Sequence, residues 1–289
     1  MNQTINILVA GATGTNGRAL LEQFVQNKVA VRAMVRDAEK AAHLANEYVQ
    51  LVEADLAKPE SLTAAFDGIE KAYIVTAISP ETPEWFSNFY QAAKQANVKK
   101  LVKFSGLGAD VNSPSEVIRQ HGYSDQALID SGLTYTILRP NSFHQNMFWQ
   151  AEAIKGSKQF YLPLGEAKQS IVDVRDLAEV SFKILTEAGH DNKIYELTGP
   201  ESLSFHEVAA QLSSVLNEQI TYVPVPGQAA LDAMLGQGMP QWSADVLVEI
   251  QELFATGKYA YVTDDLAKLL GREPTSFKQF AEDHSKLFK

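Results

Sequence analysis

A short apolar segment, residues 5–10, runs directly into a stretch with three glycines, Gly11, Gly14 and Gly17, and a helical pattern follows. An apolar run without polar alternation is typical of a parallel strand buried on both faces. In a strand–turn–helix unit, Gly11 permits the tight turn, Gly14 lets the backbone approach a pyrophosphate, and Gly17 lets the helix pack closely. Free N–H groups at the helix start favour an anion. We therefore expect a dinucleotide-binding loop, with a purely structural turn as the alternative. The expected contacts are Gly11, Ala12, Thr13, Gly14, Thr15, Asn16 and Gly17.

Apolar segments and helical patterns alternate six times before residue 140. Such alternation predicts an α/β fold with a doubly wound parallel sheet. The expected strands are residues 5–10, 29–35, 49–52, 72–75, 101–104 and 135–138. The expected helices include residues 38–45, a segment opened by Pro59, and residues 86–96.

The alternation stops after Pro140, and longer helical stretches take over. They cover residues 143–154, 174–186, 205–216, 229–235, 243–254 and 277–288, with short strands at residues 170–172, 195–197 and 220–223. This pattern predicts a smaller α+β C-terminal lobe. We expect a nucleotide-binding domain over residues 1–140 and a substrate-binding lobe over residues 141–289, interleaved with strands and helices that return to the sheet. A cleft between the two is the expected site.

Composition excludes several classes of function. The chain has no cysteine, which removes thiolate nucleophiles and Cys-ligated metals, and its six histidines show no paired metal-ligand spacing. The net charge of −10, from 25 basic and 35 acidic residues, disfavours nucleic acid and anionic membranes as partners. No apolar run reaches the ~18 residues of a membrane span, and Met1–Thr4 lacks the basic flank of a signal peptide. We expect a cytoplasmic protein without a metal, with a small molecule as partner; a homodimer is compatible with the sequence.

The end of the second strand bears on the choice between NAD and NADP. A carboxylate at this point accepts a hydrogen bond from the ribose 2′-hydroxyl of NAD, whereas an arginine accommodates the 2′-phosphate of NADP. Arg36 stands at this strand end, and Asp37 follows it. We expect NADP(H) to be preferred over NAD(H); the alternative is that Asp37 takes the ribose. Asp55 and Leu56, after the third strand, are expected near the adenine, unless Asp55 only caps its loop.

Several of these segments together resemble the NmrA-like branch of the atypical short-chain dehydrogenase/reductases. The resemblance rests on residues 11–17, Arg36, Asp55-Leu56, residues 131–140 (Ser-Gly-Leu-Thr-Tyr-Thr-Ile-Leu-Arg-Pro) and residues 173–178 (Asp-Val-Arg-Asp-Leu-Ala), and it continues in residues 195–200 and 271–277. That branch includes NADPH-dependent quinone and triphenylmethane reductases as well as redox-sensing regulators. The resemblance implies a Rossmann-type fold and a nicotinamide cofactor.

The resemblance also suggests where the nicotinamide half of the cofactor lies. The loop after the fourth strand lies where the C-terminal edge of the sheet meets the cofactor in this fold, so we expect contacts there; an ordinary strand-to-helix loop is the alternative. The resemblance implies contacts from the segment after the sixth strand; Asn141 could instead cap a helix. The residues concerned are Thr76, Ala77, Ile78, Ser79, Pro140, Asn141 and Phe143. Phe143, Phe148 and Trp149 are candidate substrate-binding residues, with core packing as the alternative. Asp173 and Asp176 are expected to have structural roles at a helix start.

The chain departs from the wider superfamily at the catalytic dyad, Tyr-x-x-x-Lys. Ser105 ends the fifth strand, where the superfamily has its catalytic Ser, but counting back from Ser131 puts His121 in the Lys position and Val117 in the Tyr position. Without a Tyr activated by Lys, alcohol oxidation lacks its general base, whereas hydride transfer to an electrophilic acceptor needs mainly positioning. His121 is a candidate for orienting the nicotinamide ribose or donating a proton; a surface histidine is the alternative.

We therefore expect an NADP(H)-dependent oxidoreductase, similar to quinone reductases, that reduces a quinone-like or conjugated acceptor by direct hydride transfer. The alternative is a non-catalytic NADP(H)-binding redox sensor of the NmrA type. Ser105 and His121 are both the candidate catalytic residues and candidate cofactor contacts.

Overall fold

The computed structural model describes residues 5–289 and divides the chain into two compact units. Unit 1 comprises the chain up to Asn112 together with Arg119–Arg139 and Leu177–Tyr195, and unit 2 comprises Ser113–Ile118, Pro140–Asp176 and Glu196–Lys289. The chain thus passes between the units several times. The sequence features of Met1–Thr4 lie outside the described residues.

Unit 1 is built on a seven-stranded sheet with the strand order β3-β2-β1-β4-β5-β6-β9. Its strands are β1 (Ile7–Ala10), β2 (Val31–Val35), β3 (Val49–Glu53), β4 (Lys71–Ile74), β5 (Lys100–Phe104), β6 (Tyr135–Pro140) and β9 (Lys193–Leu197). All pairs from β3 through β6 are parallel. The order reverses direction at β1, which is the hallmark of a doubly wound sheet. The Rossmann-type α/β fold expected from the sequence is confirmed.

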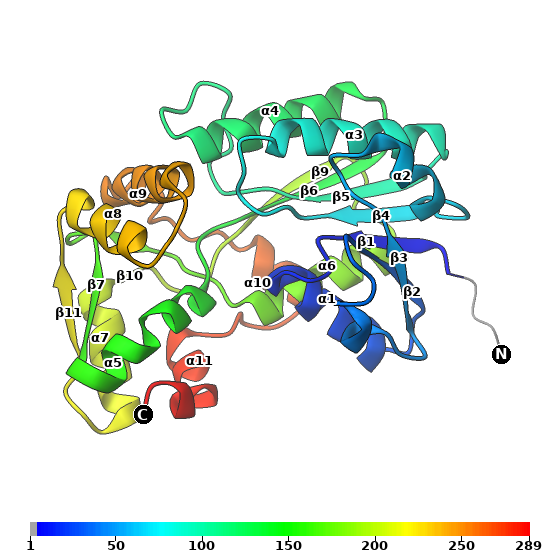
Figure 1. Cartoon of the computed structure of the whole chain (residues 1–289). Helices are drawn as coiled ribbons and strands as arrows, with labels where there is room; N and C mark the ends of the chain where they lie inside the picture. Colours follow the sequence, from blue (N-terminus) through cyan, green and yellow to red (C-terminus); the bar gives the residue numbers. More distant parts are fainter. Residues whose placement is uncertain (1–4) are drawn as a thin grey trace. The chain divides into compact units, whose positions relative to one another are not determined.

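Helices cover both faces of this sheet (Figure 1). One face carries α1 (Thr15–Gln26) and α6 (Val174–Thr186), whose Phe24 and Phe182 rings meet edge to face at 5.1 Å. The other face carries α2 (Pro59–Ala65), α3 (Thr82–Gln95) and α4 (Glu116–Asp130). Apolar side chains of these three helices form one buried core with strands β1, β4, β5 and β6. The sheet is therefore buried on both faces, which explains its continuous apolar strands.

The prediction of a helix over residues 38–45 is wrong. Only a single 3-10 turn, η1 (Ala42–Leu44), forms there. The Asp37 carboxylate accepts a hydrogen bond from the Lys40 amide at 3.0 Å, and the Asn46 side chain accepts bonds from the amides of Tyr48 and Val49. These two side-chain-capped turns lead the chain back to β3 within a few residues. Because only Ala41 of the segment is buried, packing supplies little to stabilise a longer helix.

Unit 2 contains two small sheets and short helices. Strand β7 (Gln159–Leu162) runs parallel to β11 (Thr221–Pro224), and β8 (Lys168–Gln169) runs antiparallel to β10 (Leu203–Ser204). The helices are α5 (Ala151–Ser157), α7 (Phe205–Leu216), α8 (Gly227–Gly236), α9 (Gln241–Ala255), α10 (Asp265–Leu270) and α11 (Phe277–Asp283), with 3-10 turns η2 (His144–Gln150) and η3 (Ser285–Leu287).

Three expectations for unit 2 are wrong in detail. The helix expected over residues 143–154 is a 3-10 segment followed by α5, and the one over residues 277–288 stops at Asp283. The strand expected over residues 170–172 is reduced to one bridge, between Phe143 and Val172, just beyond β8. Strands β7 and β10 and helix α10 were not expected. Within residues 5–289, the longest helices are too short or too polar to cross a membrane.

Candidate functional site

The glycine loop after β1 has the geometry that its three glycines predict. Gly11 has a φ of +80°, a region that favours glycine, and its carbonyl accepts a hydrogen bond from the Gly14 amide at 3.1 Å. A Cβ on Gly11 would collide with the Val75 carbonyl after β4, and one on Gly17 would collide with the Gly11 carbonyl. Two of the three glycines are therefore required by close backbone approach.

The N-terminus of α1 is open toward the loop. Gly14 is its N-cap residue, with no side-chain cap and no acidic residue in the first turn. Thr13, Gly14 and Thr15 are exposed, and the space where a Cβ of Gly14 would stand is free to 3.5 Å. Unpaired N–H groups and the positive end of the helix dipole favour an anion at this point.

Asn16, in the first turn of α1, supplies a further observation. Its Oδ1 atom is buried and has no hydrogen-bond partner among the described residues. A buried polar atom without a partner carries a cost, which a bound group could relieve. The open helix end and the missing Cβ together fit the pyrophosphate of a dinucleotide. The Asn16 Oδ1 is an acceptor, so it fits a donor of the same ligand, such as a hydroxyl or amide group.

Arg36 and Asp37 differ in their availability at the end of β2. Arg36 is exposed and makes no hydrogen bond or ion pair within residues 5–289. Asp37 is engaged locally: it pairs with the Lys40 ammonium at 2.8 Å, and that contact holds the pKa of the carboxyl below its usual range. Arg32 is also engaged, because it donates to the carbonyls of Ala65 and Asp67. Only Arg36 of the three keeps its polar groups free for a ligand.

Asp55 and the loop after β4 show mainly internal contacts. The Asp55 carboxylate accepts a hydrogen bond from the Ala57 amide at 3.0 Å, so it caps its own turn, and Leu56 packs against the core below α3. In the second loop, the Thr82 hydroxyl accepts from the Ser79 amide and donates to the Ala77 carbonyl. Ala77 and Ile78 are exposed and Thr76 is partly buried. The Thr82 hydroxyl thus holds this loop through Ser79 and Ala77, while Ala77 and Ile78 remain exposed to a ligand.

Ser105 lies in a buried polar cluster at the end of β5. Its hydroxyl donates to the Asp125 carboxylate at 2.8 Å and accepts from the Lys103 ammonium at 3.0 Å. Asp125 also accepts from Lys103 at 2.6 Å and from the Arg139 Nε at 2.9 Å. The side chains of Lys103 and Asp125 are almost completely buried. The Ser105 hydroxyl is therefore taken up inside unit 1.

Burial and the neighbouring charges act in opposite directions on the pKa values of Lys103 and Asp125. Burial lowers the pKa of Lys103, against the pull of Asp125. Burial acts to raise the pKa of Asp125, but Lys103 and Arg139 outweigh it and hold that pKa below its usual range. Two cations therefore face one carboxylate.

His121 lies one helical turn before Asp125 on α4. Burial and the positive charge of Lys103 lower its pKa to about 3, so the imidazole is neutral at physiological pH. Its Nδ1 atom is buried and has no partner in the described part of the chain. The ring packs on Gly106, where a Cβ would lie 2.9 Å from the His121 Cδ2. Neutral His121 can orient a ligand by hydrogen bonding, but it cannot supply a proton as an imidazolium.

Pro140 is the last residue of β6, and Asn141 and Phe143 follow it; all three belong to unit 2. Asn141 is buried, and its amide donates to the Ser170 hydroxyl at 2.8 Å and to the Tyr259 carbonyl at 3.0 Å, while its Oδ1 accepts from the Ser142 amide. Its polar atoms are thus used internally, and the side chain fixes the segment that carries Phe143. Phe143 is partly buried.

The aromatic candidates in unit 2 have different surroundings. Phe148 stacks on Phe280 at 5.4 Å and contacts Phe288, in a cluster completed by His144, Phe277 and His284. Trp149 is 76% exposed. Phe148 is partly buried in this aromatic cluster, and Trp149 lies on the surface.

Asp173 and Asp176, at the start of α6, have the structural roles expected of them. Asp173 accepts from the Arg175 amide and guanidinium. Nearby His144 and Arg175 lower the pKa of the carboxyl against the effect of burial. Asp176 accepts from the Arg272 guanidinium at 2.8 Å and from the Thr275 amide at 2.6 Å. Both carboxylates are buried.

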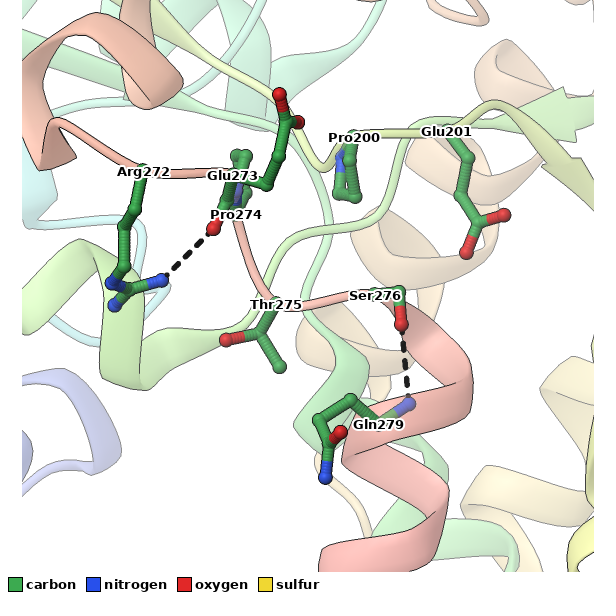
Figure 2. A pocket seen from close by; sticks show the side chains of 8 residues that line it. All are labelled: Pro200, Glu201, Arg272, Glu273, Pro274, Thr275, Ser276 and Gln279. Atoms are coloured by element: carbon green, nitrogen blue, oxygen red, sulfur yellow. Dashed lines mark hydrogen bonds between the residues drawn. The ribbon is translucent and has the colours of Figure 1, made fainter.

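Arg272 and Thr275 also line a hollow of about 590 Å³ in unit 2 (Figure 2). The other lining residues are Pro200, Glu201, Glu273, Pro274, Ser276 and Gln279. Figure 2 shows Arg272 turned back toward the Glu273 carbonyl, and Ser276 capping α11 through the Gln279 amide. None of the residues that the sequence proposes for cofactor or substrate lines this hollow.

The family of the chain follows from its sequence. Residues 11–188, which include the glycine loop and the Lys103–Asp125 cluster, match the family described as NAD(P)H-binding. The chain belongs to this NAD(P)H-binding family.

Several relatives of this NAD(P)H-binding protein are named as reductases. It is 39% identical to NAD(P)H azoreductase of Xenophilus azovorans, over 98% of this chain and 99% of the relative. The solved NADPH-dependent quinone oxidoreductase from Escherichia coli, complexed with NADPH, matches it with a TM-score of 0.88 at 30% identity, over 98% of this chain and 100% of that one. Triphenylmethane reductase of Citrobacter sp., complexed with NADP(H), matches with a TM-score of 0.87 at 27% identity, over 96% and 99%. The resemblance drawn from the sequence is confirmed, and the chain is an NAD(P)H-dependent oxidoreductase.

Sequence reasoning missed the charged residues behind Ser105 in this NAD(P)H-binding protein. Lys103 is the one charged residue in the expected apolar strand 101–104, and Asp125 lies one helical turn after His121. A lysine in a strand buried on both faces needs a partner, which was the available signal. What the sequence did not show is which carboxylate pairs with it.

Proposed function

We propose that this oxidoreductase uses NADP(H) in preference to NAD(H) and transfers hydride to a quinone-like or conjugated small-molecule acceptor. The observation that carries the cofactor preference is the contrast at the end of β2, where Arg36 is free and Asp37 is occupied by Lys40. A guanidinium matches the charge and geometry of a 2′-phosphate. Two solved relatives, complexed with NADPH and with NADP(H), support the same cofactor preference.

The glycine loop is assigned to the pyrophosphate in this proposal. Gly14 offers an exposed backbone without a Cβ, and the start of α1 offers unpaired N–H groups beside it. Asp55 and Leu56 lie toward the adenine, and residues 76–79 toward the nicotinamide half. Phe143 and Trp149 remain candidates for binding the substrate. Asn141 and Phe148 are assigned structural roles, because Asn141 is hydrogen-bonded internally and Phe148 stacks on Phe280.

The bound cofactor supplies the hydride, and the protein supplies position and electrostatics. A quinone that accepts a hydride becomes a hydroquinone anion, and one proton from solvent completes the reduction. No general base has to be activated for this reaction, in contrast to alcohol oxidation. Ser105 is held internally and His121 is neutral, so neither is assigned as the proton source. His121 is assigned to hydrogen bonding at the nicotinamide half.

The proposal is tested by NADPH oxidation with a panel of acceptors. Loss of NADPH absorbance is followed with benzoquinones and naphthoquinones, with an azo dye and with a triphenylmethane dye, because the relatives named above act on these classes. We expect turnover with at least one quinone and slower turnover with NADH. Tight binding of both cofactor forms, without turnover of any acceptor, contradicts the reductase and supports a redox sensor.

A further inference from the structure

The buried cluster of Lys103, Ser105, Asp125 and Arg139 contains more polar contacts than a single ion pair. Lys103 on β5 and Ser105, directly after this strand, are two residues apart, and both reach Asp125 on α4, as does Arg139 on β6. The Phe86 ring of α3 covers the Lys103 ammonium at 4.6 Å. Three side chains from neighbouring strand ends thus converge on one buried carboxylate.

His121 is connected to this cluster through α4. It precedes Asp125 by four residues, so both lie on the same side of the helix. The Asp125 bonds to Lys103 and Ser105 fix that side of α4 against the end of β5. There the missing Cβ of Gly106 leaves the recess that the His121 ring occupies.

We propose that Lys103 and Asp125 are positioning residues of the proposed reductase, which hold His121 on Gly106 as a hydrogen-bonding group toward the nicotinamide half of the cofactor. The inference rests on the proposed function for the role of His121. The positioning itself follows from the contacts in unit 1.

The charges around His121 explain why it stays neutral. The groups that face it are Lys103 from β5, Arg139 from β6 and Asp125 from its own helix. Two cations against one anion leave an excess positive charge, which opposes protonation of the imidazole. The buried Nδ1 atom of His121 has no hydrogen-bond partner within residues 5–289, so this position of the ring lowers the stability of the fold. Such a cost is typical of functional positions.

Lys103→Met is the decisive variant, with Lys100→Met as its matched control. Methionine keeps the apolar stem under Phe86, and Asp125 keeps its bonds to Ser105 and Arg139. Lys100 lies on the same strand, is similarly buried and pairs with Asp191 at 3.3 Å, away from His121. The two variants therefore remove the same kind of buried cation from two places.

The first measurement is the pKa of His121 by NMR, with its imidazole signal assigned through His121→Gln. We expect Lys103→Met to raise that pKa by about one unit or more, and Lys100→Met to leave it in place. The second measurement is the pH profile of kcat/KM for NADPH. We expect the profile to stay flat from pH 7.5 down to about 4.5 in the wild type and in Lys100→Met, and to begin falling below about pH 5 in Lys103→Met, as the imidazole becomes protonated. A role in stability alone would not change the shape of this profile.

Two further variants keep the inference falsifiable if Lys103→Met does not fold. Arg139→Met removes the second cation, and we expect a smaller shift of the His121 pKa in the same direction. Gly106→Ala displaces the ring without changing any charge, and we expect kcat/KM for NADPH to fall roughly 10- to 100-fold with little change in Tm. Gly156→Ala, where a Cβ would meet open space in α5, is its control.

The outcomes separate the inference from the proposed function. An unchanged His121 pKa in both Lys103→Met and Arg139→Met overturns the inference, as do parallel pH profiles of Lys103→Met and Lys100→Met. If the wild type oxidises no NADPH with any acceptor, the proposed function fails. The NMR titration then still decides whether Lys103 and Asp125 set the state of His121.

Discussion

Gly17 lies so close to Gly11 that a Cβ on Gly17 would overlap the Gly11 carbonyl oxygen. Gly14, between them, has no such restriction: its φ is −77° and the nearest atom to its would-be Cβ is 3.5 Å away. The loop therefore uses glycine for two different reasons, namely packing at Gly11 and Gly17 and access at Gly14.

Alanine variants of Gly14 and Gly17 should consequently differ. We expect Gly17→Ala to lower the free energy of unfolding by about 1–3 kcal/mol, because backbone atoms must move. We expect Gly14→Ala to change it by less than about 1 kcal/mol and to weaken NADPH binding about tenfold, because a methyl group fills the approach to the phosphates. Thermal melting and NADPH titration measure the two effects. If Gly14→Ala binds NADPH with wild-type affinity, the assignment of this loop to the pyrophosphate is contradicted.

Arg36→Ala tests the cofactor preference. We expect the KM for NADPH to rise roughly 10- to 100-fold, as for the loss of a charge-assisted hydrogen bond, while the KM for NADH stays the same. Arg32→Ala is the control, since Arg32 is bound to the Ala65 and Asp67 carbonyls and should affect stability rather than preference. Equal effects of Arg36→Ala on NADPH and NADH contradict the 2′-phosphate assignment.

Phe148 and Trp149 are adjacent but should respond in opposite ways. We expect Phe148→Ala to cost about 1–3 kcal/mol of stability, because it removes the partly buried ring that stacks on Phe280. We expect Trp149→Ala to change stability by less than about 0.5 kcal/mol, because the side chain is 76% exposed. Denaturant unfolding gives both values, and the KM for a quinone then shows whether Trp149 contacts the acceptor. An unchanged KM in Trp149→Ala excludes that contact.

The lowered pKa of His121 predicts an acid-sensitive step in stability. The unfolded chain binds a proton at His121 near its ordinary pKa of about 6.5, whereas the folded chain binds it only near about 3. Stability should therefore be complete above about pH 6.5 and decrease as the pH falls through this window. His121→Gln should show a smaller loss of Tm between pH 6.5 and 4 than the wild type. An identical pH dependence in the two proteins would mean that His121 is already protonated in the folded state at mildly acidic pH.

The sequence predicted unit 1 well because its signals are local. Apolar strands such as β1 and glycine turns such as Gly11 are encoded within a few residues. The segment at residues 38–45 shows the limit of this reasoning, since its composition favours a helix but its side chains cap short turns instead. The contacts of Asn141 with Ser170 and Tyr259 join residues far apart along the chain, so no local pattern predicts them.

The candidate site was predictable in its outline only. The glycine loop, Arg36 and His121 stand at recognisable positions of a strand–helix pattern. The pairing of Lys103 with Asp125, 22 residues later, depends on how α4 crosses β5, which no local pattern determines. The aromatic residues show the same limit, because Phe148 and Trp149 differ in burial although they are neighbours in sequence.

Strand β9 and helix α6 come from a late part of the chain, after its first long passage through unit 2. Phe182 of α6 packs on Phe24, and the Leu185 carbonyl accepts a hydrogen bond from Lys71 at 2.7 Å. During translation, a nascent chain that has emerged only as far as residue 140 still lacks the edge strand beside β6 and one of the helices on the α1 face. A fragment cut at that residue should therefore expose an unpaired strand edge and aggregate, and the nucleotide-binding half can be completed only after the ribosome has passed residue 195.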